Sequence, residues 1–219
     1  MKNDETLQQD VQKALKWEPL LHAAEIGVAV KDGIVTLTGS VDSYTKKREA
    51  EDASKKVTGV KAVIESIKVE LVSKAKKDDK ELADEVVAAL RWNWQIPDDK
   101  IKVKVEDGWI TLEGDLEWNY QREEAQKSLT SLIGIKGFTN KLNIKSNRID
   151  EIEKKTIEAA LARNWALEHE DILVKVQGNK VSLTGVVNSL YRKEEAGVIV
   201  WKTPGVCSLE NELIVDLKK

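Results

Sequence analysis

The sequence predicts an α+β protein made of three tandem αββαβ units, each a three-stranded mixed sheet with two helices packed on one face. One observation behind this prediction is a motif that occurs three times in the 219 residues with matching flanks: Val35-Thr36-Leu37-Thr38-Gly39, Ile110-Thr111-Leu112-Glu113-Gly114 and Val181-Ser182-Leu183-Thr184-Gly185. The other is the switch, within each copy, from helical spacing of apolar residues to strict alternation. Strands that alternate in this way have one apolar face, which two helices can cover.

The copies align without insertion or deletion from the first helix to the last strand. We predict domains at residues 4–71, 78–145 and 150–217, joined by residues 72–77 and 146–149. Linkers this short favour a compact or semi-rigid arrangement over freely tumbling units. The sequence does not predict how the units are arranged or the oligomeric state.

The first predicted element of each unit is an amphipathic helix. In the second unit, Asp78 and Glu81 have the spacing of a capping box. Leu82, Val86 and Leu90 then follow at helical spacing and mark the buried side.

The next two elements are predicted to form a β-hairpin. Apolar residues alternate along its first strand: Ile26, Val28 and Val30, with counterparts Ile101, Val103, Val105 and Ile172, Val174, Val176. The strands are joined by two-residue turns of the kind that needs positive φ: Asp32-Gly33, Asp107-Gly108 and Gly178-Asn179. We expect the second strand to end at the shared glycine: Gly39, Gly114 or Gly185.

A second helix and a last strand complete each unit. The helix is predicted to start near Tyr44, Tyr120 or Tyr191, to bury Ala50, Ala125 or Ala196, and to stop at a glycine in a left-handed cap: Gly59, Gly134 or Gly205. The last strand alternates again: Val63, Ile67, Val69; Phe138, Leu142, Ile144; and Leu209, Leu213, Val215. We therefore assign these glycines structural roles.

With this order of elements the chain resembles the BON family, the bacterial OsmY and nodulation domain. The resemblance rests on the pattern V-x-D-G-x-V-x-L-x-G at 30–39, its counterpart at 105–114, and the joint G-V-x-x-V at 59–63. The third copy departs from the pattern at Gly178-Asn179. The resemblance implies phospholipid or envelope association, a role in osmotic stress or potassium sensing, and it carries over no catalytic residues.

The cysteine count, the N-terminal residues and the lengths of the apolar runs bear on the compartment in which the protein is expected. Cys207 is the single cysteine, so an internal disulfide is excluded. The N-terminal residues have no apolar signal region, and no apolar run has the length of a membrane span. We expect a cytoplasmic protein as the sequence stands, and a periplasmic one if a leader has been removed.

The sequence offers no set of residues for catalysis or metal binding. His22 and His169 are the two histidines, and they occupy non-equivalent positions in different units. Phosphate-binding glycine loops are missing, and most carboxylates alternate with apolar residues or fall in turns. We therefore predict no catalytic residue, metal or cofactor. Acidic residues outnumber basic ones in every unit, which argues against nucleic-acid binding.

The tryptophans are the unusual feature, since there are seven of them and one phenylalanine. Trp17, Trp92, Trp94 and Trp165 cluster at the ends of the first helices. The favoured interpretation is that the rings cover thin cores or pack unit against unit. The alternative is an exposed patch in the second unit that touches a membrane interface or a partner: Trp92, Trp94, Trp118 and Tyr120.

These observations favour a non-enzymatic binding protein over an enzyme. We expect its partner to be a phospholipid surface or an envelope protein, bound by several similar surfaces on one chain. One alternative is a potassium-binding module that holds the ion with backbone carbonyls, and another is a scaffold for protein–protein interaction. An enzyme would need a cleft between units, for which the sequence gives no sign.

Overall fold

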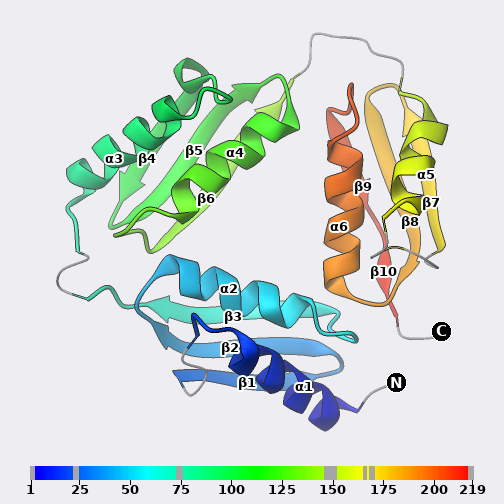
Figure 1. Cartoon of the computed structure of the whole chain (residues 1–219), viewed down its shortest axis with the longest axis horizontal. Coiled ribbons are helices and arrows are strands. Elements are labelled where there is room, and N and C mark those ends of the chain that lie inside the picture. Colours follow the sequence, from blue (N-terminus) through cyan, green and yellow to red (C-terminus); the bar gives the residue numbers. More distant parts are fainter. Residues whose placement is uncertain are drawn as a thin grey trace. The chain divides into compact units, whose positions relative to one another are not determined.

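The computed structural model describes residues 3–21, 25–72, 76–145, 152–164, 167 and 171–216. Its elements follow the predicted order three times, so the α+β class and the repeated αββαβ units are confirmed (Figure 1). Some predicted features lie outside the described residues: His22, Asp150, Trp165, His169, Leu217 and the second linker, 146–149. Each repeat is described below by itself.

The elements of each repeat have the following bounds. Repeat 1 comprises α1 (Asp4–Trp17), β1 (Ile26–Lys31), β2 (Ile34–Val41), α2 (Tyr44–Lys55) and β3 (Ala62–Val69). Repeat 2 comprises α3 (Asp79–Trp92), the short 3-10 helix η3 (Asp98–Lys100), β4 (Ile101–Glu106), β5 (Trp109–Leu116), α4 (Asn119–Thr130) and β6 (Gly137–Ile144). Repeat 3 comprises α5 (Lys154–Ala162), β7 (Asp171–Gln177), β8 (Lys180–Val187), α6 (Leu190–Trp201), β9 (Ser208–Asn211) and β10 (Ile214–Val215).

Each sheet is mixed and has the second strand of the hairpin at its centre. In repeat 2 the order is β4-β5-β6, with β4 antiparallel and β6 parallel to β5. In repeat 3 the last strand is interrupted, and both of its parts, β9 and β10, run parallel to β8. The two helices of each repeat lie on the same face of its sheet (Figure 1).

The core of each repeat lies between those helices and the sheet. In repeat 2 the side chains that face each other are almost inaccessible to solvent: Leu82, Val86, Leu90, Ile110, Leu112, Leu116, Ala125 and Leu129. The predicted capping box at Asp78 and Glu81 is present, so α3 begins where expected. Burial of this apolar surface is what holds each small unit together.

Two predicted boundaries were wrong. The second strand does not end at its glycine, because β5 stays paired with β6 from Gly114 to Leu116 after its pairing with β4 has ended. The second helix ends before its glycine, as α2 stops at Lys55 and α4 at Thr130. Gly59 and Gly134 lie beyond these helices with φ of 105° and 100°, so they shape the following turn.

The hairpin turns have the predicted backbone. Asp32 and Gly33 have φ of 54° and 81°, and Asp107 and Gly108 have φ of 50° and 78°, as a type I′ turn requires. In repeat 3, Gly178 has a φ of 58° and Asn179 has no positive φ, which suits a type II′ turn.

A carboxylate that was not predicted holds the turn in repeats 1 and 2. Asp79, in the first turn of α3, accepts hydrogen bonds from the backbone N–H groups of Asp107 (2.8 Å) and Gly108 (2.9 Å). Asp4 in α1 does the same for Asp32 and Gly33. In repeat 3 the Asn179 side chain donates to the Gly205 carbonyl, at 2.8 Å.

Candidate functional site

The end of the first helix presents bare tryptophan rings in two repeats. Trp92 and Trp94, at the end of α3, are 88% and 89% exposed. Trp17 is the counterpart of Trp92 at the end of α1 and is 86% exposed. The favoured interpretation, that rings cover the core, does not hold for these three side chains within their own repeats. Large apolar side chains that are this exposed make the three tryptophans the candidate site.

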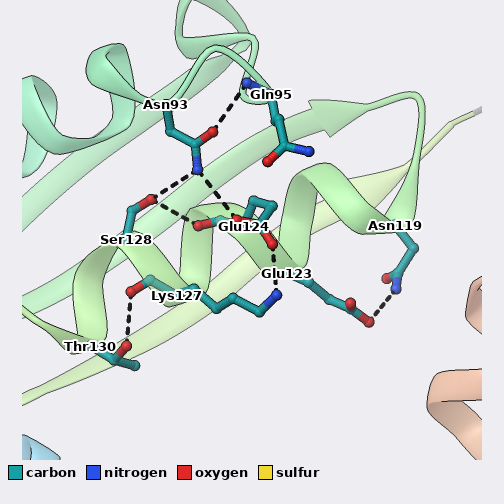
Figure 2. Close-up of polar contacts among 8 residues, drawn as sticks. All are labelled: Asn93, Gln95, Asn119, Glu123, Glu124, Lys127, Ser128 and Thr130. Carbon is teal, nitrogen blue, oxygen red and sulfur yellow. Dashed lines mark hydrogen bonds and ion pairs between the residues drawn. The ribbon is translucent and has the colours of Figure 1, made fainter.

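Asn93 lies between the two exposed rings and ties their turn to α4. Its side-chain amide faces Glu124 and Ser128, each at 3.4 Å, and its carbonyl oxygen accepts from the backbone N–H of Gln95 (Figure 2). Its backbone N–H bonds the Leu90 carbonyl at the end of the helix. The residue between the tryptophans is therefore fixed, while the rings on either side stay in solvent.

The charge of Glu124, the acidic partner of Asn93, is balanced by a lysine. Lys127 donates to Glu124 at 2.6 Å (Figure 2). This hydrogen bond, assisted by the one from Asn93, lowers the pKa of the Glu124 carboxyl. The ammonium of Lys127 balances the charge beside the tryptophans, so the surface there is polar without a strong net charge.

The other two predicted site residues differ in exposure. Tyr120, in the first turn of α4, is 48% exposed. Trp118 precedes that helix and is half-buried, and its backbone N–H donates to the side chain of Gln121. The predicted patch is thus uneven, with Trp92 and Trp94 as its most accessible members.

Two further tryptophans fit the packing interpretation. Trp109 lies across Gly137, where an added Cβ would come within 2.4 Å of the indole ring. Its Nε1–H donates to the Thr139 hydroxyl at 3.0 Å, which fixes the ring on the sheet. Trp201 packs against the core of repeat 3. Trp201 thus covers the core of its own repeat, whereas Trp109, which is 44% exposed, is held on the outer face of its own sheet.

In repeat 1 the exposed ring borders an open groove between α1 and α2. The groove has a volume of about 400 Å³, and its walls combine small apolar side chains with charged ones: Lys13, Ala14, Trp17, Glu18, Ala53, Lys56 and Val57. Its size and open form suit a surface contact better than an enclosed ligand.

The residue that follows the first helix by one position or two differs between the repeats, and this difference was not predicted: Glu18, Asn93 and Asn164. Asn93 and its counterpart Asn164 each donate to a glutamate of the second helix, Glu124 and Glu195. In repeat 1 the corresponding pair is Glu18 and Glu49, so two carboxyls meet there. Burial, and then the negative charge of Glu18, raise the pKa of the Glu49 carboxyl, while Lys56 acts in the opposite direction. Alignment of the repeats could have revealed this exchange.

The exchange predicts that Glu18→Asn lowers the pKa of Glu49, because an amide donor replaces a like charge. A raised pKa in the folded state means that this carboxyl's stabilising contribution is present below its ordinary pKa and is lost as pH rises through the raised value. We expect the variant to be more stable at neutral pH by a few tenths of a kcal/mol, since the site is largely solvated. A carboxyl ¹³C NMR titration measures the pKa, and Lys13→Gln serves as the control. An unchanged Glu49 pKa in Glu18→Asn would contradict the coupling.

Within the described ranges, no group of three or more histidine, cysteine, aspartate or glutamate side chains could hold a metal ion. Among the same residues, no helix has both the length and the apolar character needed to cross a bilayer.

Comparison with known proteins gives one family and one curated relative. The sequence profile of the BON domain matches residues 3–70, 78–146 and 150–216. Osmotically-inducible protein Y of Escherichia coli (strain K12) is 27% identical over 147 residues, which cover 65% of this chain and 73% of the relative.

The solved structures that match include two of CdsD, a structural protein of the type III secretion system of Chlamydia trachomatis. The first is 17% identical, covers 96% of this chain and 92% of the other, and gives a TM-score of 0.24. The second, its C-terminal domain, is also 17% identical, covers 98% of this chain and 100% of the other, and gives 0.25. At TM-scores this low, the two matches carry no argument about this chain.

Proposed function

The chain belongs to the BON domain family in each of its three repeats, and we propose that it is a non-enzymatic, OsmY-like binding protein of the osmotic stress response. Its partner in this proposal is a phospholipid surface. The similarity to osmotically-inducible protein Y supports the stress role.

The observation that carries the lipid proposal is the exposure of Trp92 and Trp94 on either side of the anchored Asn93. Indole rings favour the level of the lipid headgroups, where their apolar body and their N–H are both accommodated. Trp17 offers a second contact from another repeat of the same chain. Two weak contacts on one chain bind a continuous surface more strongly than either alone.

Charge makes only a small contribution in this proposal. The chain has a net charge of −3, so anionic lipid does not attract it as a whole. Binding through tryptophans should therefore change little between low and high salt, whereas binding through a basic patch would fall steeply.

We expect the double variant Trp92→Ser/Trp94→Ser to reduce liposome binding by at least about tenfold, because each ring would bury on the order of 100 Å² in the interface. Co-sedimentation with vesicles of phosphatidylethanolamine and phosphatidylglycerol measures it. Both rings are exposed, so circular dichroism should not change.

Leu173→Ser is the matched control, because Leu173 is a large exposed side chain (70%) on a strand of repeat 3. It should leave vesicle binding as it is. Normal binding by the tryptophan double variant would defeat the lipid proposal and leave these rings for a protein partner.

The potassium alternative predicts a different result. A site made of backbone carbonyls would give a binding isotherm in calorimetry with potassium chloride and none with sodium chloride, and the tryptophan variants would not alter it. The lipid proposal predicts no difference between the two salts.

A further inference from the structure

The first strand of repeat 1, β1, is an edge of its sheet. Among the strands that the structure describes, the order β1-β2-β3 leaves one side of β1 without a neighbour. Gly27, Ala29 and Lys31 lie opposite Thr38, Thr36 and Ile34 across the hairpin. Lys31 and Ile34 flank the two-residue turn, so they form a hydrogen-bonded pair, and the backbone groups of Gly27, Ala29 and Lys31 bond to β2. The backbone groups of Ile26, Val28 and Val30 therefore face outward. An outward row of N–H and C=O groups is a template for another strand.

Repeats 1 and 2 treat this edge differently. In β4 the solvent-facing positions hold Lys102 and Lys104, and lysine on an edge strand prevents pairing with another chain. Their counterparts in β1 are Gly27 and Ala29, which are exposed and uncharged. The edge of repeat 1 therefore has a lysine only at its turn end, Lys31, and lacks the central lysines that protect the edge of repeat 2.

The outer face of the sheet follows the same contrast. In repeat 2 it carries ion pairs between neighbouring strands, Glu113 with Lys141 and Asp115 with Lys145. In repeat 1 the same face presents Ile34, Thr36 and Ile64, of which Ile34 and Ile64 are 39% and 51% exposed. A strand added beside β1 would extend a face that is partly apolar, with its lysines, Lys31 and Lys68, at the ends of their strands.

One side chain from α1 covers part of this edge. The Gln8 amide donates to the Val28 carbonyl at 2.7 Å. The corresponding residues are Ala83 in repeat 2 and Lys154 in repeat 3, so the contact belongs to repeat 1. The neutral Gln8 amide protects the edge less well than a lysine would, because the backbone N–H of an added strand can replace the amide as the donor to the Val28 carbonyl.

We propose that the edge of β1 pairs with β1 of a second copy of this chain, antiparallel, so that two three-stranded sheets join into one. With a two-fold axis at Ala29, Ala29 lies opposite its own counterpart, and Val28 exchanges backbone hydrogen bonds with Val30. In this register the central pairs, Ala29 with Ala29 and Val28 with Val30, are uncharged, and Lys31 lies opposite Gly27. No like charges are set against each other, which suits a second copy of this chain. The same pairing in β4 would set Lys104 against Lys104, and like charges directly opposite are destabilising.

Cysteine cross-linking on the full chain tests this pairing. In a Cys207→Ser background, Ala29→Cys should form disulfide-linked dimers at least about tenfold faster than Lys104→Cys, because pairing raises the effective thiol concentration. The expected Cα separation across such a pair, about 4.5 Å, lies within disulfide range. Equal cross-linking rates at positions 29 and 104 would overturn the proposal.

Light scattering of the unmodified chain gives an independent reading. The mass should rise towards that of a dimer with increasing concentration, and Ala29→Lys should return it to the monomer with an unchanged circular dichroism spectrum. Gln8→Ala should shift the equilibrium towards the dimer, since it frees the Val28 carbonyl. If circular dichroism shows a folded chain, a monomeric mass for both the wild type and Gln8→Ala at every concentration would refute the pairing.

Discussion

Gly114→Ala is expected to unfold repeat 2. Gly114 has a φ of 154°, and a Cβ built there lies 2.1 Å from the Lys100 carbonyl oxygen. That oxygen belongs to the backbone, at the start of β4 where Ile101 pairs with Gly114, so it cannot rotate away. Relief of the clash requires the hairpin to open. We expect a loss of more than about 4 kcal/mol, which a domain of this size does not tolerate.

Gly178→Ala is the matched control for this effect. Gly178 also has a positive φ, 58°, but an added Cβ has nothing within 4 Å. Its cost should be only the strain of the left-handed conformation, about 1–2 kcal/mol. Amide hydrogen exchange of the full chain distinguishes the repeats, with β4 to β6 losing protection in Gly114→Ala alone. Equal protection of repeat 2 in the two variants would mean that the backbone can adjust after all.

Asp79→Ala should produce the second largest loss, about 2–3 kcal/mol from repeat 2, because hydrogen bonds to a charged group are stronger than neutral ones. The carboxylate joins the N-terminus of α3 to the hairpin turn through two backbone N–H groups. It also lies where a negative charge favours the helix dipole. Its removal leaves the turn at Asp107 and Gly108 held less firmly.

Urea unfolding followed by amide exchange in β4 and β5 measures this loss. Asp79→Asn keeps an oxygen acceptor without the charge and should recover part of the stability. Asp84→Ala, an exposed change on the same helix, should alter it by less than about 0.5 kcal/mol. If Asp79→Ala and Asp84→Ala unfold at the same urea concentration, the carboxylate does not hold the hairpin.

The sequence could predict those parts of the fold that depend on neighbouring residues. The alternation of β4 and β5, the Asp107-Gly108 turn and the Asp78 cap are all decided within a few positions. The role of Gly114 could not be assigned in this way, because it depends on the carbonyl of Lys100 across the hairpin. Repetition shows where a glycine is needed, and only the pairing partner shows why.

The candidate site could be predicted only in part, for the same physical reason. A tryptophan at a helix end suits both a core edge and an exposed patch, and the difference lies in what covers it. Trp109 has Gly137 and Thr139 beneath it, whereas Trp92 is 88% exposed. Asn93 was missed because its partners, Glu124 and Ser128, lie far along the chain.

The anchors of the hairpin turns also affect how the chain can fold during synthesis. In repeats 1 and 2 the turn is held by Asp4 or Asp79, which leaves the ribosome before the turn does. The first two hairpins can therefore be fixed as they emerge, before the second helix and the last strand of their repeats have been made.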